Sequence, residues 1–182
     1  STRKESSAAS DVYKRQPIGG GDEGILMQLA MIGLGRMGAN IVRRLMRAGH
    51  ECVVYDVNAD AVQALVAEGA VGADSMADLA SKLEAPRAVW MMVPASLTGA
   101  VADQVAEVLD EGDILIDGGN SNYRDDVRRA KAFRERGIHY VDVGTSGGVF
   151  GLDRGYCLMV GGPDEAVQRI EPVLRTIAPG VG

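Results

Sequence analysis

Apolar and polar residues follow two alternating patterns along this chain. Short, nearly continuous apolar runs, such as RAVWMMV at 87–93, are typical of strands buried on both faces of a sheet. Longer runs with apolar residues every three or four positions are typical of helices packed against a sheet. The predicted strands are 28–32, 51–55, 87–93, 113–117, 139–143 and 156–160. The predicted helices are 37–47, 59–68, 75–83, 97–109, 123–135 and 163–177.

The regular succession of strand and helix, joined by short turns, predicts an α/β fold. A parallel sheet covered by helices on both faces produces this order. No internal repeat or linker interrupts residues 27–182. We therefore expect one doubly wound, mostly parallel, Rossmann-like domain over 27–182.

The two ends of the chain depart from this pattern. Residues 1–26 have no hydrophobic period and no signal-peptide core, so we expect a disordered tail. The segment DVYKRQ at 11–16 also matches a translated transposon end from sequencing libraries, which indicates an assembly artefact and a native start at Met27. The chain stops in the turn-like run APGVG at 178–182, so we expect a fragment that is truncated at the C-terminal end of this domain.

Composition and charge argue against two classes of binding partner. A net charge of −6 without any Lys/Arg run argues against nucleic acid. No apolar stretch approaches the ~20 residues needed to span a bilayer, so we expect no membrane partner and a cytoplasmic location. The two cysteines, Cys52 and Cys157, lie in apolar runs. We expect buried free thiols there rather than a disulfide or a metal pair.

The first candidate site is a glycine-rich loop between the first strand and the first helix. Its residues are Gly33, Leu34, Gly35, Arg36, Met37 and Gly38. In such a loop the first glycine permits a tight turn, the second admits a pyrophosphate, and the third lets helix and strand pack closely. The helix start adds N–H groups and the positive end of its dipole. The setting predicts a dinucleotide-binding loop, with Arg36 beside the pyrophosphate or in solvent.

Asp56 ends the second strand, close to the spacing of about 20 residues expected after the first glycine. A carboxylate at this position accepts hydrogen bonds from the adenosine ribose and repels a 2′-phosphate. No Arg follows in VNA at 57–59 to receive that phosphate. The pattern favours NAD over NADP, unless Asp56 is a plain turn residue.

Loops after later strands are further candidates, because ligands bind beyond the carboxyl ends of parallel strands. One candidate comprises Met92, Val93 and Pro94, where apolar groups either flank a nicotinamide ring or form ordinary core and turn. In DGGNS at 117–121, Asn120 offers both a donor and an acceptor, and Ser121 is expected to cap the next helix.

The last candidate loop is GTSGG at 144–148, which follows the strand 139–143. Its small donors and bare backbone suit a carboxylate or several hydroxyls, and a simple flexible loop is the alternative. The binding candidates here are Ser146, Gly147 and Gly148.

Taken together, these motifs resemble the 6-phosphogluconate dehydrogenases, a branch of the β-hydroxyacid dehydrogenase superfamily. The similarity rests on MIGLGRMGANIVRRL at 31–45, IDGGNSNYRDD at 116–126 and DVGTSGGVFGLDRGYCLMVGG at 142–162. The last segment looks like the shorter, bacterial-type enzymes. Where NADP-using members carry Asn-Arg after the second strand, this chain has Asp56-Val57, which supports NAD.

The resemblance implies a role for each candidate loop. Residues 33–38 and Asp56 would bind the dinucleotide, and residues 92–94 would lie near its nicotinamide. Asn120 would touch cofactor and substrate, while residues 146–148 would hold the sugar acid. The implied reaction oxidises 6-phosphogluconate at C3, passes hydride to NAD (with NADP possible), and releases CO₂ without a metal to give ribulose 5-phosphate.

Such a reaction needs a general base and a general acid, which in the family are a Lys and a Glu on a helix after the Rossmann domain. We expect both to lie beyond Gly182, with the all-helical domain absent from this chain, so that the fragment alone is inactive. His50 and His139 begin strands, at the wrong edge of the sheet for catalysis, and are expected to be packing or surface residues. The full-length enzyme is expected to be a homo-oligomer.

Two other functions remain open. One is another β-hydroxyacid dehydrogenase, similar to the hydroxyisobutyrate dehydrogenases, which the setting of Asn120 in DGGNS disfavours. The other is a dinucleotide-binding module without catalysis, which requires Gly182 to be a true terminus.

Overall fold

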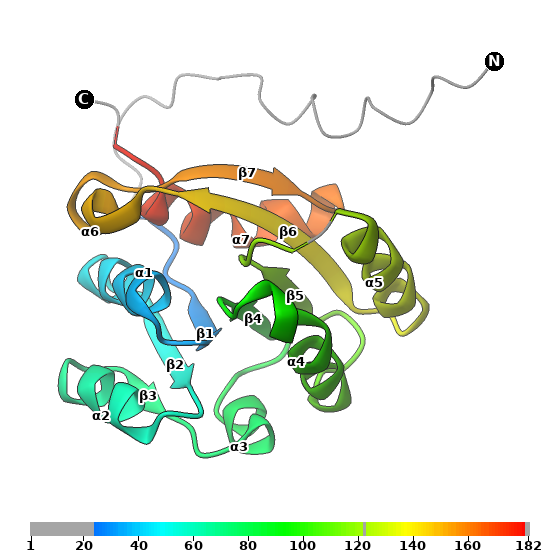
Figure 1. Ribbon diagram of the computed structural model, residues 1–182, viewed down its shortest axis with the longest axis horizontal. Helices are drawn as coiled ribbons and strands as arrows, with labels where there is room; N and C mark the ends of the chain where they lie inside the picture. Colours follow the sequence, from blue (N-terminus) through cyan, green and yellow to red (C-terminus); the bar gives the residue numbers. More distant parts are fainter. Residues whose placement is uncertain (1–23, 122, 181–182) are drawn as a thin grey trace.

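A seven-stranded sheet with helices on both faces accounts for most of the chain (Figure 1). The computed structural model describes residues 24–121 and 123–180, so most of the predicted tail lies outside the described residues. The strands are β1 (Gln28–Ile32), β2 (Glu51–Tyr55), β3 (Val71–Gly72), β4 (Ala88–Met91), β5 (Ile114–Asp117), β6 (His139–Ser146) and β7 (Cys157–Gly161). The helices are α1 (Arg36–Arg47), α2 (Ala59–Ala67), α3 (Met76–Ser81), α4 (Ala95–Val108), α5 (Tyr123–Glu135), the 3₁₀ turn η2 (Gly148–Phe150), α6 (Gly151–Arg154) and α7 (Asp164–Ile177).

The strand order is β3-β2-β1-β4-β5-β6-β7, with parallel pairing from β3 to β6 and antiparallel pairing between β6 and β7. The chain runs outward from β1 to β3 and then returns to place β4 on the other side of β1. The carboxyl ends of β1 and β4 therefore diverge at a topological switch point, where doubly wound sheets bind ligands. The predicted Rossmann-like fold is confirmed.

Two hydrophobic cores hold the layers together, because alternate residues of each strand face opposite sides of the sheet. Leu29 and Met31 of β1 pack with the apolar faces of α1, α2 and α7. Ala30 and Ile32 pack on the opposite face, in the core shared with α3, α4 and α5. In the described part of the chain, no helix is both long and apolar enough to cross a membrane.

The structure differs from the predicted elements mainly near β6 and β7. Strand β6 continues to Ser146, three residues beyond its predicted end, because Gly144, Thr145 and Ser146 pair with β7. The hydrophobic pattern also predicted no element at β3, η2 or α6. Their short lengths leave no hydrophobic period to detect.

The prediction that both cysteines are buried is half wrong. Cys52 is buried in β2, and burial raises the pKa of its thiol to about 12. Cys157 is exposed, as is Met159, whose exposed fraction is 72%. Both lie on an edge strand whose alternate residue, Leu158, faces the core. An edge strand covered on one face thus exposes every second side chain despite its apolar sequence.

Candidate functional site

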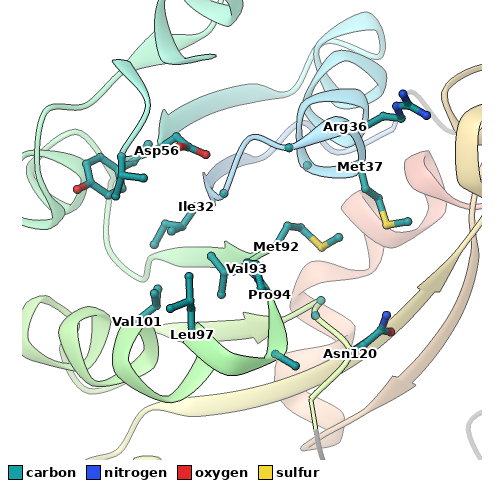
Figure 2. Close-up of a pocket in the computed structure, with 18 of the residues that line it drawn as sticks. Ile32, Arg36, Met37, Asp56, Met92, Val93, Pro94, Leu97, Val101 and Asn120 are labelled. Atoms are coloured by element: carbon teal, nitrogen blue, oxygen red, sulfur yellow. The ribbon is translucent and has the colours of Figure 1, made fainter. Parts of the chain in front are cut away.

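A cleft of about 620 Å³ opens at the switch point, beyond the carboxyl ends of β1, β2, β4 and β5. Its volume lies within the range typical of small-molecule sites. The predicted residues that line it are Gly33, Gly35, Arg36, Met37, Gly38, Asp56, Met92, Val93, Pro94 and Asn120. Figure 2 shows Asp56 toward one end of the cleft and Asn120 toward the other, with Met92 between them.

The three glycines of the loop after β1 are required for three different reasons. Gly33 has a φ of 92°, and a Cβ there would collide with the Met92 carbonyl oxygen. A Cβ on Gly38 would collide with the Gly33 carbonyl oxygen, so this glycine lets α1 pack directly on the loop. A Cβ on Gly35 would meet no atom within 4 Å, because that position faces open space.

The start of α1 fits a phosphate group. Gly35 precedes the helix without a side-chain cap, and its first turn carries no acidic residue. The first N–H groups of a helix have no intrahelical acceptor and lie at the positive end of the dipole. Together with the open space at Gly35, this arrangement suits a pyrophosphate. The Arg36 side chain is exposed and points away from the centre of the cleft (Figure 2).

Two backbone N–H groups hold the carboxylate of Asp56 in place. Oδ2 accepts from the N–H of Leu34 at 2.7 Å, and Oδ1 accepts from the N–H of Asn58 at 2.8 Å. Leu34 is not among the lining residues; its side chain is buried in the core, and its contribution is this backbone bond. The bond to Leu34 thus joins the end of β2 to the glycine-rich loop after β1. The fixed carboxylate therefore marks one end of the cleft.

The wall of the cleft near Asp56 is apolar. Met76, Leu97 and Val101 come from α3 and α4, and Gln104 supplies an amide on the same wall. These residues were not among the predicted site residues, because they lie on helices whose polar and apolar pattern predicted packing alone. Such a wall suits a flat, weakly polar ring.

Asn120 lies where β4 and β5 end. Gly118 and Gly119 precede it, and a Cβ on Gly118 would collide with Trp90 Nε1 and Met92 Sδ. The loop is therefore packed tightly against the end of β4. The hydroxyl of Ser121 donates to Asp117 Oδ2 at 2.6 Å, which ties this side chain to the end of β5. Its predicted role as a helix cap stays a prediction, because residue 122 lies outside the described residues.

Ser146, Gly147 and Gly148, the predicted substrate residues, are not among those that line this cleft. Their neighbour Thr145 does line it, and sequence analysis did not single it out. A Cβ on Gly147 would come within 2.8 Å of the Tyr156 ring. The segment is therefore packed on a buried aromatic ring and directly follows Thr145, which lines the cleft.

Within the described part of the chain, the ionisable residues that line the cleft are Arg36, Tyr55 and Asp56. Neither His50 nor His139 lies there, since each is at the amino end of its strand. His50 is buried, accepts from the N–H of Met27 at 3.0 Å, and is a packing residue as predicted. These lining groups thus suit the binding and orientation of a ligand. The described residues that line the cleft include no lysine or glutamate that could transfer a proton near Asn120.

The comparisons with known proteins agree with this geometry. The sequence model of a family described as the NAD-binding domain of 6-phosphogluconate dehydrogenase matches residues 28–181. The chain belongs to this family. The resemblance inferred from the motifs is therefore confirmed.

Individual relatives carry the same family name. The NAD(+)-dependent, decarboxylating 6-phosphogluconate dehydrogenase of Haloferax volcanii is 46% identical over 155 residues, which are 85% of this chain and 51% of that protein. The decarboxylating enzyme of Haemophilus influenzae is 42% identical over 82% of this chain and 32% of its own length. The chain thus spans about half the length of the first relative and about a third of the second.

Solved structures of two kinds share the fold. The 6-phosphogluconate dehydrogenase of Plasmodium falciparum superimposes with a TM-score of 0.80 at 26% identity, over 85% of this chain and 35% of that one. A 3-hydroxyisobutyrate dehydrogenase of Salmonella typhimurium gives 0.76 at 28% identity, over 85% and 55%. Both of these proteins are dehydrogenases, and the backbone fold that they share with this chain does not separate their two substrates.

Proposed function

We propose that this chain is the cofactor-binding part of an NAD-preferring 6-phosphogluconate dehydrogenase that converts 6-phosphogluconate to ribulose 5-phosphate. The observation that carries the NAD preference is the carboxylate of Asp56, which two backbone N–H groups fix at one end of the cleft. Fixed in this way, it can accept hydrogen bonds from the ribose hydroxyls and repels a 2′-phosphate. The next residue, Val57, is 93% exposed and offers no positive charge to such a phosphate.

The glycine-rich loop and the loops after the later strands bind different parts of the cofactor and the substrate. Residues 33–38 hold the pyrophosphate, residues 92–94 lie beside the nicotinamide, and Asn120 contacts both cofactor and substrate. Ser146, Gly147 and Gly148 bind the sugar acid. NAD, when bound, supplies the hydride acceptor, and no metal is needed. The Lys and Glu that transfer protons belong to a helical domain of the longer, homo-oligomeric enzyme, and the domain described here supplies the cofactor site.

Calorimetric titration of the chain with NAD and with NADP tests the cofactor preference. We expect NAD to bind more tightly, and Asp56→Ala to lower NAD affinity about tenfold, because hydrogen bonds to a charged acceptor are lost. Asp56→Asn removes the charge but keeps an acceptor for Leu34, so the affinity for NADP should rise while the loop stays in place. Asp60→Ala is the matched control, because Asp60 is an exposed carboxylate on α2 that does not line the cleft.

Equal affinity of the wild-type chain for both cofactors would refute the role given to Asp56. Activity is tested on the longer protein, by following NADH formation from 6-phosphogluconate. Formation of NADH from 3-hydroxyisobutyrate alone would favour the second candidate, to which the Salmonella structure gives support.

A further inference from the structure

A buried carboxylate lies directly beneath the loop that carries Asn120. Asp117, the last residue of β5, is 0% exposed. Its Oδ1 accepts from the N–H of Gly119 at 2.9 Å. Its Oδ2 accepts from the hydroxyl of Ser121 at 2.6 Å and from the hydroxyl of Tyr140 at 2.7 Å. These three donors come from two parts of the chain, the loop itself and β6.

Burial of a carboxylate is costly unless hydrogen bonds compensate it. All three donors are neutral, so Asp117 forms a network of hydrogen bonds rather than an ion pair. A second buried aspartate, Asp113, directly precedes β5 and differs in this respect, because Arg87 Nη1 lies 3.1 Å from its Oδ2. A residue needed for stability alone could be apolar at the position of Asp117. The network therefore indicates that Asp117 acts on the loop that carries Asn120.

The loop geometry supplies that role. Gly119 and Ser121 flank Asn120, and both donate to Asp117. From the other side, the loop packs on Trp90 and the end of β4. Asn120 is thus held between two anchored neighbours, and Tyr140 ties the anchor to the next strand.

We propose that Asp117 is a positioning residue, which fixes Asn120 in the geometry that binds the dinucleotide, with Ser121 and Tyr140 as its partners. The inference rests on the proposed function, since it assumes that Asn120 touches the cofactor. It assigns to a buried side chain, outside the cleft lining, a share of the cofactor affinity.

A double-mutant cycle with NADH as the probe tests this role. The variants are Asp117→Asn, Asn120→Ala and their combination, and affinity is measured by calorimetry on the full 182-residue chain. We expect Asp117→Asn to weaken NADH binding about fivefold, because one amide oxygen cannot accept from all three donors. In the Asn120→Ala background the same substitution should cause no further loss, since residues that act through one another are not additive.

Asp113→Asn is the matched control. Asp113 is buried immediately before the amino end of β5, and its carboxylate accepts from the N–H groups of Arg87 and Asp110 at 2.6 and 2.8 Å. Its substitution should lower the melting temperature without changing NADH affinity. Ser121→Ala is a milder second variant, because Ser121 is only half-buried, and it should give a smaller loss of affinity that also disappears without Asn120.

The fluorescence of Trp90 provides an independent signal. It is the chain's single tryptophan, it is fully buried, and the loop packs on its indole nitrogen. Loosening of the loop in Asp117→Asn should admit water and shift the emission to longer wavelength, whereas Asp113→Asn should leave it unchanged.

The outcomes separate this inference from the proposed function. If wild-type chain binds NADH and Asn120→Ala weakens binding, but Asp117→Asn does not, the positioning role is wrong and the proposed function stands. An undiminished loss from Asp117→Asn in the Asn120→Ala background would show a general structural role and also overturn the inference. If wild-type chain fails to bind NADH, the proposed function falls and this inference falls with it.

Discussion

At the scale of single residues, the three glycines of the loop after β1 are present for different physical reasons. Gly33 and Gly38 are fixed by the protein itself, since a side chain at either would strike backbone. Gly35 is not constrained in this way, because its missing side chain would enter open space. We therefore attribute glycine at this position to the proposed pyrophosphate ligand rather than to the fold.

Alanine substitutions should separate these two reasons. Gly35→Ala should leave the free energy of unfolding nearly unchanged but weaken NAD binding at least tenfold, because its methyl group would occupy the pyrophosphate's place. Gly33→Ala should destabilise the chain by about 2 kcal/mol or more, because it combines a positive φ with a backbone clash. Urea denaturation and calorimetry of both variants measure these effects. A large loss of stability in Gly35→Ala would contradict the assignment.

At the scale of elements, Arg44 joins three helices. It lies in the last turn of α1, and its guanidinium donates to the carbonyl oxygens of Thr176 at 2.7 Å and Ala178 at 3.0 Å, at the end of α7. It also donates to the carbonyl oxygens of Leu152 and Asp153 in α6, at 3.1 and 3.4 Å. The last carbonyls of a helix have no intrahelical partner and favour a cation. One side chain thus attaches α6 and α7 to the nucleotide-binding half of the sheet.

Removal of this side chain should lower stability much more than removal of its neighbour. Arg44→Met should reduce the free energy of unfolding by about 2–3 kcal/mol, because four carbonyl groups lose a charged donor. Arg47→Met is the control, since Arg47 is exposed and has an ion pair with Asp153 at 3.5 Å. Its cost should stay below about 1 kcal/mol. Equal costs in chemical denaturation would show that Arg44 does not join the helices.

At the scale of the whole molecule, His50 links the start of the sheet to the last helix. Its Nδ1 accepts from the N–H of Met27, so its Nε2 carries the proton and donates to Thr176 Oγ1 at 2.9 Å. Burial lowers the pKa of His50 below its ordinary value of 6.5. Protonation of Nδ1 would break the bond to Met27, so the folded state favours the neutral ring.

Stability should therefore fall on mild acidification. Between the ordinary pKa of 6.5 and the lower pKa of folded His50, the unfolded chain binds more protons. The contribution of His50 is thus complete above the ordinary value, decreases as the pH falls through this window, and is constant below it. Urea denaturation across this range should show the slope, and His50→Gln should reduce it. His139→Gln, which removes the other histidine, should leave the His50 contribution intact.

The sequence by itself determined the α/β fold, the glycine-rich loop after β1, and the position of Asp56 and Asn120 at strand ends that line the cleft. These features depend on local patterns, namely hydrophobic period, glycine spacing and position at a strand end, and adjacent residues are enough to specify them. Only the tertiary structure decided the extension of β6 to Ser146, the exposure of Cys157, and the network beneath Asn120. Each depends on a partner distant in sequence: β7 for the extension, an uncovered sheet face for the thiol, and Tyr140 for Asp117. A side chain's burial and bonds are set by what packs against it, which local patterns do not contain.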